Sequence, residues 1–316
     1  MCSRIIMNWG SIMFLHKDDR ELFHDVIVTV SDRMGVAIDI VEKDYYVTMI
    51  LSELARYSDK VVFKGGTSLS KAYKAIDRFS EDVDITFTEH IGSARRKKLK
   101  YQVLQPISEK LDLPVSNWNR IESDKDYNHY DFVYRSVVDE ANPLQPWVKV
   151  ETALMSYAFP TETRDISNFI FDCLKTTDPD ILADFGLNPF PMKVQTLSRT
   201  LIDKMFAVCD YYLMGKPRRN SRHLYDIYKL YPLISDDATF AKLIGEVYIQ
   251  RGLMDPERTP AAQPGINVGE VAKKLCHEDF YREDYEETTK KLISGDLSYA
   301  EVIDFYSTLM DMYFRQ

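Results

Sequence analysis

Apolar positions in the first part of the chain recur at helical spacing. Residues 17–57 predict two helices, and the second carries an apolar stripe made of Val47, Ile50, Leu51 and Leu54. Asp39 is followed three residues later by Glu42, which is the spacing of a capping box at the start of that second helix. The chain is therefore expected to open with a pair of helices.

The hydrophobic period changes near residue 61. The run VVF at 61–63 is β-branched and aromatic, and Gly65 and Gly66 separate it from the helical segment TSLSKAYKAI. Residues 83–88 (VDITFT) then alternate between apolar and polar positions. This order predicts a strand, a glycine turn, a helix and a second strand.

The middle of the chain mixes both periods. Residues 93–111 are basic and helical in pattern, and strand-like runs follow near 115–121, 130–138 and 146–154. The loop DEANPLQP between the last two runs carries two prolines, which favours an antiparallel pair. Residues 175–193 have the composition of a loop.

Helical periodicity dominates the remainder. The first helix there ends before Gly215 and Pro217, and its apolar stripe is Leu201, Met205, Val208 and Tyr212. Further helices are predicted for 222–231, 236–252, 279–293 and 298–314, the last opened by the capping box Ser298-x-x-Glu301.

This change of character predicts two domains, for which a chain of 316 residues is long enough. Residues 1–192 are expected to form an α/β domain with a mixed sheet and N-terminal helices. Residues 193–316 are expected to form a C-terminal helical domain. The predicted fold class is therefore α+β, with an α/β-like first part.

Composition narrows the class of protein. Hydrophobic residues make up 45% of the chain and charged residues 28%, which is typical of a folded globular protein. No apolar stretch reaches the roughly 18 residues of a membrane span, and the N-terminus does not read as a signal peptide, so no membrane and a cytoplasmic location are expected. The four cysteines lie far apart and predict neither a disulfide scaffold nor a zinc finger.

Charge is distributed unevenly along the chain. The formal net charge of −9 argues against nucleic-acid binding by the whole surface. Two short segments are nonetheless strongly basic, RRKKLK at 95–100 and KPRRNSR at 216–222. They are candidates for contact with a nucleic-acid backbone, and the alternative is that both are ordinary solvated faces.

Two carboxylates form the first candidate site. Asp82 and Asp84 flank Val83 on a predicted strand, so their side chains point to the same side. Two acids at this spacing repel unless a cation lies between them, and oxygen ligands favour Mg²⁺ or Mn²⁺. Taken alone the pattern is weak, because most such pairs are solvated edge residues.

A candidate anion site lies upstream of these acids. Gly65, Gly66, Thr67 and Ser68 occupy the predicted turn from strand to helix, where free backbone amides attract phosphate. A glycine pair before a helix is also common as a simple turn. The combination of a phosphate site and a metal site indicates a nucleotide.

Together these residues resemble the nucleotidyltransferase superfamily with a DNA polymerase β-like fold. Within it, residues 63–87 (FKGGTSLSKAYKAIDRFSEDVDITF) are similar to the AbiEii/AbiGii-type nucleotidyl transferase toxins of bacterial abortive-infection and toxin–antitoxin systems. Three further segments agree with that family: VEKDYYVTMIL at 41–51, LSRTLIDK at 197–204 and RHLYDIYKL at 222–230.

The resemblance implies roles for individual residues. Gly65, Gly66, Thr67 and Ser68 would hold the triphosphate, and Asp82 and Asp84 would hold the metal ions. Lys204 would contact the nucleotide phosphates or the leaving pyrophosphate, and Asp226 would have a further polar role in the cleft. The alternatives are a surface lysine and an exposed ion pair between Arg222 and Asp226. The sequence departs from the family at His223, where an aspartate is expected after the arginine.

Three more candidates surround this core. Glu151 is the preferred third metal ligand, since it shares a strand face with Lys149, and Asp131 on the preceding strand is its rival. Lys149 is a second candidate for contact with phosphate. Arg78 and Ser80 lie beside the two acids and are also candidates, unless they only shape the loop.

The expected function is a metal-dependent nucleotidyltransferase toxin. An acceptor hydroxyl would attack the α-phosphorus of an NTP, and pyrophosphate would leave. The resemblance implies an RNA acceptor, with the 3′ end of tRNA preferred, and a cognate antitoxin as protein partner. The alternatives are transfer to a small molecule or a protein hydroxyl, and a non-catalytic module that binds a nucleotide or a partner.

Overall fold

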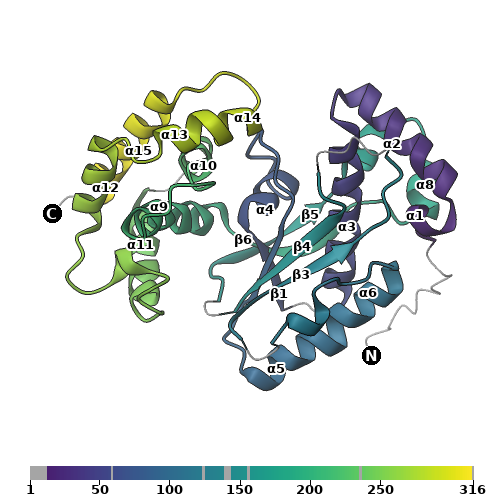
Figure 1. Cartoon of the computed structure of the whole chain (residues 1–316), viewed down its shortest axis with the longest axis horizontal. Helices are drawn as coiled ribbons and strands as arrows, with labels where there is room; N and C mark the ends of the chain where they lie inside the picture. The colour runs from purple at the N-terminus through teal and green to yellow at the C-terminus, as the bar shows by residue number, and fades with distance from the viewer. Residues whose placement is uncertain are drawn as a thin grey trace.

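A central mixed sheet organises the N-terminal half of the molecule (Figure 1). The computed structural model describes residues 13–57, 60–122, 125–138, 144–154, 157–234 and 237–314. Within these ranges six strands form one sheet in the order β3-β4-β2-β1-β6-β5. The strands are β1 (Val61–Lys64), β2 (Val83–Phe87), β3 (Tyr127–Val133), β4 (Trp147–Ala153), β5 (Thr161–Ile166) and β6 (Phe190–Gln195).

Strand pairing in the sheet is mixed, which confirms the predicted α+β class. β2 runs parallel to β4, and β1 runs parallel to β6. The β1–β2, β3–β4 and β5–β6 pairs are antiparallel. The predicted antiparallel pair is therefore β3–β4, although part of the loop between them lies outside the described residues.

Helices surround the sheet and bury its apolar side chains. Helix α3 contacts β4 and β6, and α4 contacts β1 and β2. The helices of this half are α1 (Leu15–Asp18), α2 (Arg20–Met34), α3 (Ile38–Tyr57), α4 (Gly65–Lys71), α5 (Ser93–Lys98), α6 (Gln105–Leu111), α7 (Phe169–Leu174) and α8 (Pro179–Asp184). A π-helical segment, Leu99–Leu104, joins α5 to α6, so the predicted helix 93–111 is continuous.

A second group of helices, green to yellow in Figure 1, stands beside the sheet. It comprises α9 (Leu197–Leu213), α10 (Arg222–Leu230), α11 (Asp237–Gly252), α12 (Val268–His277), α13 (Arg282–Asp284), α14 (Lys290–Leu292) and α15 (Tyr299–Phe314). These helices have their own apolar cluster, which also includes Leu69 and Ile76 from the first half. Because the cluster draws on both halves, the domain boundary near residue 192 stays a prediction.

Several predicted elements are wrong. The strand expected at 115–121 is an isolated bridge from Val115 to Phe132, followed by a short 3-10 turn at Trp118–Arg120. The loop expected at 175–193 contains α8 and the start of β6. Strand β5 and helix α12 were not predicted, and the helix expected at 279–293 is divided into α13, a π-helical segment (Tyr285–Thr289) and α14.

The two predicted capping boxes have different outcomes. The box at α15 is confirmed, because the backbone N–H of Ser298 donates to Glu301 at 2.9 Å and the Glu301 N–H donates back to the Ser298 hydroxyl at 3.3 Å. The box at α3 is wrong. Glu42 lies inside that helix and accepts hydrogen bonds from Ser136 and from the backbone N–H of Val137. In the described part of the chain no helix combines the length and apolar character needed to cross a bilayer.

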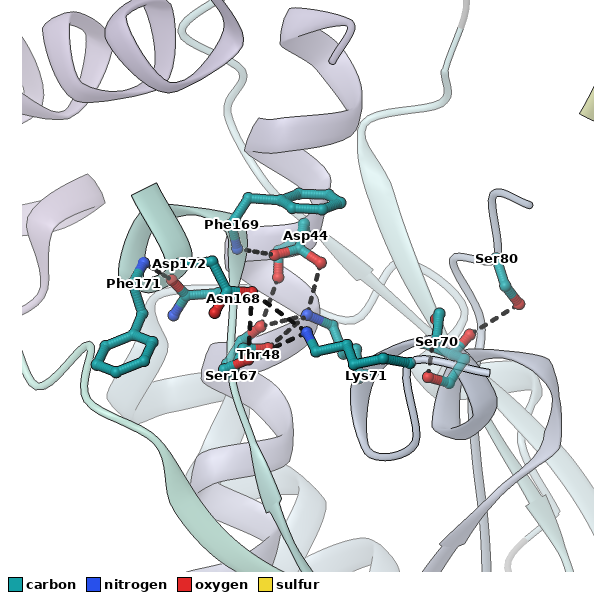
Figure 2. A network of polar contacts seen from close by, with 12 residues as sticks. Asp44, Thr48, Ser70, Lys71, Ser80, Ser167, Asn168, Phe169, Phe171 and Asp172 are labelled. Atoms are coloured by element: carbon teal, nitrogen blue, oxygen red, sulfur yellow. Dashed lines mark hydrogen bonds and ion pairs between the residues drawn. The ribbon is translucent and has the colours of Figure 1, made fainter. Parts of the chain in front are cut away.

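A buried lysine fixes α4 to its neighbours (Figure 2). The Lys71 ammonium donates to Asp44 at 2.6 Å and to Thr48 at 2.7 Å, both on α3. It also lies 3.3 Å from the carbonyl oxygen of Ser167, while the second oxygen of Asp44 accepts from the N–H of Phe169. This network ties α4, and hence the glycine turn at its start, to α3 and to the segment before α7.

Asp44→Asn should destabilise the protein by about 3–5 kcal/mol, because the Lys71 ammonium would remain buried without a charged partner. Urea unfolding measures the change, with the exposed Asp25→Asn as the control. Equal stability of the two variants would show that the Asp44–Lys71 pair does not hold α4.

Candidate active site

The turn between β1 and α4 approaches the carboxylates of β2 very closely. Gly65 has a φ of +81°, and a Cβ at this position would lie 2.0 Å from Oδ2 of Asp84. At Gly66 a Cβ would meet the Ser80 hydroxyl at 2.7 Å and the Arg78 guanidinium at 2.8 Å. A side chain at either position would force these neighbours to move, so the backbone of the glycine turn lies directly against Asp84, Ser80 and Arg78.

Strand register brings two acids and a lysine side by side on the sheet, and Asp82 directly precedes β2 instead of lying on the strand as predicted. Asp84 pairs with Glu151 of β4 on one side and with Lys64 of β1 on the other. Burial and the Glu151 charge, with a smaller effect of Asp82, raise the pKa of Asp84 to about 7, although Lys64 opposes the shift. A cation placed between these carboxylates would therefore be strongly favoured.

These groups line a cavity of about 290 Å³ between the sheet and the C-terminal helices. α9 and α10 supply the wall that faces the acids. Its lining residues are Lys64, Gly65, Gly66, Arg78, Ser80, Asp82, Asp84, Glu151, Gln195, Thr200, Asp203, Lys204, Ala207, Tyr211, Arg222 and His223. The cavity thus has an acidic side on the sheet and several cations around it.

A buried ion cluster connects the two halves behind this cavity. Arg78 donates to both oxygens of Asp226, at 2.6 and 2.7 Å, and the Lys204 ammonium lies 2.7 Å from Oδ2 of the same carboxylate. Burial alone would raise the pKa of Asp226, but Arg78 and Lys204 together lower it below its usual range. Lys204 is therefore buried rather than on the surface, and Asp226 does not form the exposed pair with Arg222.

Most predicted site residues converge on the cavity. Those that line it are Gly65, Gly66, Arg78, Ser80, Asp82, Asp84, Glu151 and Lys204. Thr67 and Ser68 do not: the Thr67 hydroxyl lies 3.0 Å from that of Ser80, and the Ser68 hydroxyl donates to the Gly65 carbonyl at 2.9 Å. Their hydroxyls hold the turn in shape.

The remaining candidates lie outside the lining. Lys149 is 3.8 Å from Glu151, and Asp131 pairs in register with Lys149 rather than with Asp84. Geometry therefore favours Glu151 over Asp131 as the third carboxylate beside Asp84. Asp226 is fully buried behind the cavity.

Sequence reasoning missed several lining residues. Lys64 directly precedes the quoted glycines, and its place in that motif was the available signal. Arg222 lines the cavity without an ion-pair partner among the described residues, in contrast to Arg78 and Lys204. His223 stacks on Tyr211 with 5.8 Å between ring centroids and 2° between planes, and its buried Nδ1 has no partner in the described chain.

The donor set suits a hard divalent cation, since Asp82, Asp84 and Glu151 offer only carboxylate oxygens. No group of three His, Cys, Asp or Glu side chains within the described ranges is spaced to enclose a metal ion by itself. Mg²⁺ is commonly held by one or two carboxylates together with substrate phosphates and water. The residues therefore fit a metal whose coordination the substrate completes.

A separate cavity of about 450 Å³ lies on the other side of the loop that carries Arg78 and Ser80. It includes the Asp44–Lys71 network of Figure 2. Its lysines are occupied, because Lys43 pairs with Glu81 and Lys74 lies 3.2 Å from Asp172. Its acids, Asp44, Asp77 and Glu81, are each paired with a lysine, whereas Asp84 of the smaller cavity has no ion pair within the described chain.

Comparison with known proteins identifies related chains. The profile of the family described as "Nucleotidyl transferase AbiEii toxin, Type IV TA system" matches residues 50–306. MenT4, a nucleotidyltransferase toxin from Mycobacterium tuberculosis, has a similar fold, with a TM-score of 0.57 at 15% identity over 93% of this chain and 90% of that chain. JHP933 from Helicobacter pylori gives a TM-score of 0.46 at 15% identity, over 87% and 92% respectively. None of the curated proteins compared with the chain matches it.

Gly65→Ala and Gly35→Ala form a matched pair, since both glycines have positive φ and nothing lies within 4 Å of a Cβ at Gly35. Gly35→Ala should cost about 1–2 kcal/mol of backbone strain. Gly65→Ala should cost a further ~1–3 kcal/mol, because its methyl group displaces Asp84. Equal losses in urea unfolding would contradict the close approach of turn and carboxylate.

Asp226→Asn should destabilise the protein by about 3–5 kcal/mol at pH 7, because Arg78 and Lys204 lose their shared carboxylate. The folded pKa of Asp226 is lowered, so its stabilisation is complete above the unfolded pKa of about 4 and is lost as the pH falls through the folded pKa. The stability gap between wild type and variant should therefore narrow between pH 5 and pH 2. A gap of constant size over this pH range would contradict the ion cluster.

Proposed function

Because the chain belongs to the AbiEii nucleotidyl transferase toxin family of type IV toxin–antitoxin systems, we propose that its cavity transfers a nucleoside monophosphate from an NTP to an RNA hydroxyl and releases pyrophosphate. One observation carries this proposal. The acids of β2 and β4 lie against a side-chain-free glycine turn, in a cavity that also contains cations unpaired within the described chain. A triphosphate that binds together with a metal ion needs carboxylates, exposed backbone amides and cations close to one another.

Asp82, Asp84 and Glu151 are the residues that would hold Mg²⁺ or Mn²⁺. A bound metal would polarise the α-phosphate, activate the acceptor hydroxyl and neutralise the leaving pyrophosphate. The missing side chain at Gly65 leaves room for the Asp84 carboxylate directly against the turn. Glu151 faces it from the adjacent strand.

The cations of the cavity divide into two groups. Arg78 and Lys204 share Asp226, so much of their charge is already balanced. Lys64 and Arg222 form no ion pair within the described part of the chain, and they are the side chains most available to the phosphates. Lys204 keeps donor capacity beyond its bond to Asp226, and the expected contact of Lys204 with phosphate remains part of the proposal.

The acceptor and the partner are proposals that membership of the family supports. We propose the 3′ end of tRNA as the acceptor, so that a capped tRNA cannot be charged, and a cognate antitoxin as the partner that restrains the enzyme. The reaction is expected in the cytoplasm, where NTPs and tRNA occur.

Incubation of the pure protein with each α-labelled NTP, Mg²⁺ and total RNA tests the reaction, and a labelled band of tRNA size is the expected result. Label on a protein or a small molecule would instead support the alternative acceptors. NTP binding without any transfer would contradict the enzyme and support a binding module.

Asp82→Asn, Asp84→Asn and Glu151→Gln should each reduce transfer more than about 100-fold, because these are the carboxylates proposed to hold the metal, and the fourth acid of the lining, Asp203, is paired with Arg199 and Arg251. Asp131→Asn is the matched control and should leave transfer close to wild type, since Asp131 lies outside the cavity. Strong loss in Asp131→Asn together with full activity in Glu151→Gln would reverse the assignment of the third carboxylate.

A further inference from the structure

The segment between α9 and α10 is a basic loop, defined here as residues 214–221 (MGKPRRNS). It contains Lys216, Arg218 and Arg219, all exposed, and no acidic residue. None of these three side chains forms an ion pair with any residue that the structure describes. In a protein with a net charge of −9, such a concentration of unbalanced positive charge is unusual.

The other basic segment, 95–100, is partly neutralised, although Lys97 and Lys98 are exposed and form no ion pair with any residue that the structure describes. Arg95 pairs with Glu89 at 2.7 Å, and Arg96 pairs with Asp126 at 2.5 Å. Lys100 is buried and donates to the carbonyl oxygens of residues 118 and 121. The two basic segments carry similar charge in the sequence, but a larger share of the positive charge remains unpaired in the basic loop than in segment 95–100.

The backbone of the basic loop is held firmly. Asp284 accepts from the N–H of Arg219 at 2.7 Å, from the N–H of Ser221 at 3.0 Å and from the Ser221 hydroxyl at 2.6 Å. Ser221 also lies 2.7 Å from the hydroxyl of Thr289. At the other end, Gly215 and Lys216 close α9 with bonds to the carbonyls of Tyr212 and Tyr211, the pattern of a Schellman motif.

Residues that flank the basic loop on both sides line the catalytic cavity, although no residue of the loop itself is part of that lining. The N–H of Lys216 donates to the carbonyl of Tyr211 at 2.8 Å, and Tyr211 lines that cavity. Arg222 and His223 follow the loop directly and line the same cavity. The exposed cations therefore stand next to the place where an acceptor must deliver its hydroxyl.

We propose that the basic loop binds the phosphodiester backbone of the RNA acceptor and directs its terminal hydroxyl into the cavity. This inference rests on the proposed nucleotidyl transfer. A preformed loop loses little conformational entropy when it binds, and unpaired cations gain the most from a polyanion that releases counterions. An acidic protein bound to the same loop would instead block the path by which the acceptor reaches the cavity.

Two charge-matched variants test this role: Lys216→Gln/Arg218→Gln/Arg219→Gln, and Arg95→Gln/Lys97→Gln/Lys98→Gln. The probe is a fluorescent hairpin RNA with a single-stranded 3′ end, titrated between 50 and 200 mM KCl. The loop variant should bind at least ~10-fold more weakly, and its log–log salt slope should fall by about 0.7–0.9 for each lost phosphate contact. The second variant should keep a wild-type slope, and neither should change the Kd of a non-hydrolysable NTP.

A wild-type affinity and slope in the loop variant would overturn the proposal, and so would an equal loss in both variants. Loss of binding to an acidic polyglutamate peptide with unchanged RNA binding would also overturn it, in favour of a protein partner. If the wild-type protein bound RNA through this loop but transferred no nucleotide, the proposed reaction would fail while the RNA contact stood.

Discussion

The shared carboxylate of Asp226 is the interaction on which the site depends. It lies on α10, Lys204 lies on α9, and Arg78 comes from the loop before β2, so one buried acid joins the sheet to the C-terminal helices. Buried cations are costly unless they are paired, and here two of them need the same partner. Arg78 in turn lies against Gly66 and close to Ser80, so the conformation of this loop is set by a residue of the other half.

The charged side chains of the cavity therefore have two different roles, one structural and one in ligand binding. Asp226 balances Arg78 and Lys204 and makes them part of the framework, whereas Lys64 and Arg222 keep their charge for a ligand. On the opposite side, burial and the charge of Glu151 raise the pKa of Asp84, so its ionised form is disfavoured there without a cation. Each side carries charge that is not balanced on its own, and a polyphosphate bound together with a divalent cation would balance both sides.

The parts of this site that depend on short sequence patterns could be predicted from the sequence. The period of 83–88 and the two glycines placed Asp84 opposite the turn, and strand alternation chose the face of Glu151. β5 was missed because it is an edge strand with largely polar residues, and β6 because Pro191 interrupts its pattern. The partners of Asp226 could not be read from spacing: helical geometry offered Arg222, but burial of the carboxylate selected Arg78, which is 148 residues away.

The same limit applies to electrostatics. Two basic segments of the sequence carry similar charge, yet Glu89 and Asp126 pair with two arginines of one of them, whereas Lys216, Arg218 and Arg219 of the other form no ion pair in the described structure. Asp284 contacts the basic loop by accepting hydrogen bonds from its backbone N–H groups. It therefore holds the loop in place without forming ion pairs with the arginine side chains. Counting charges along the sequence therefore identifies segments that could bind an anionic partner. The fold determines which of these charges remain unpaired and available to it.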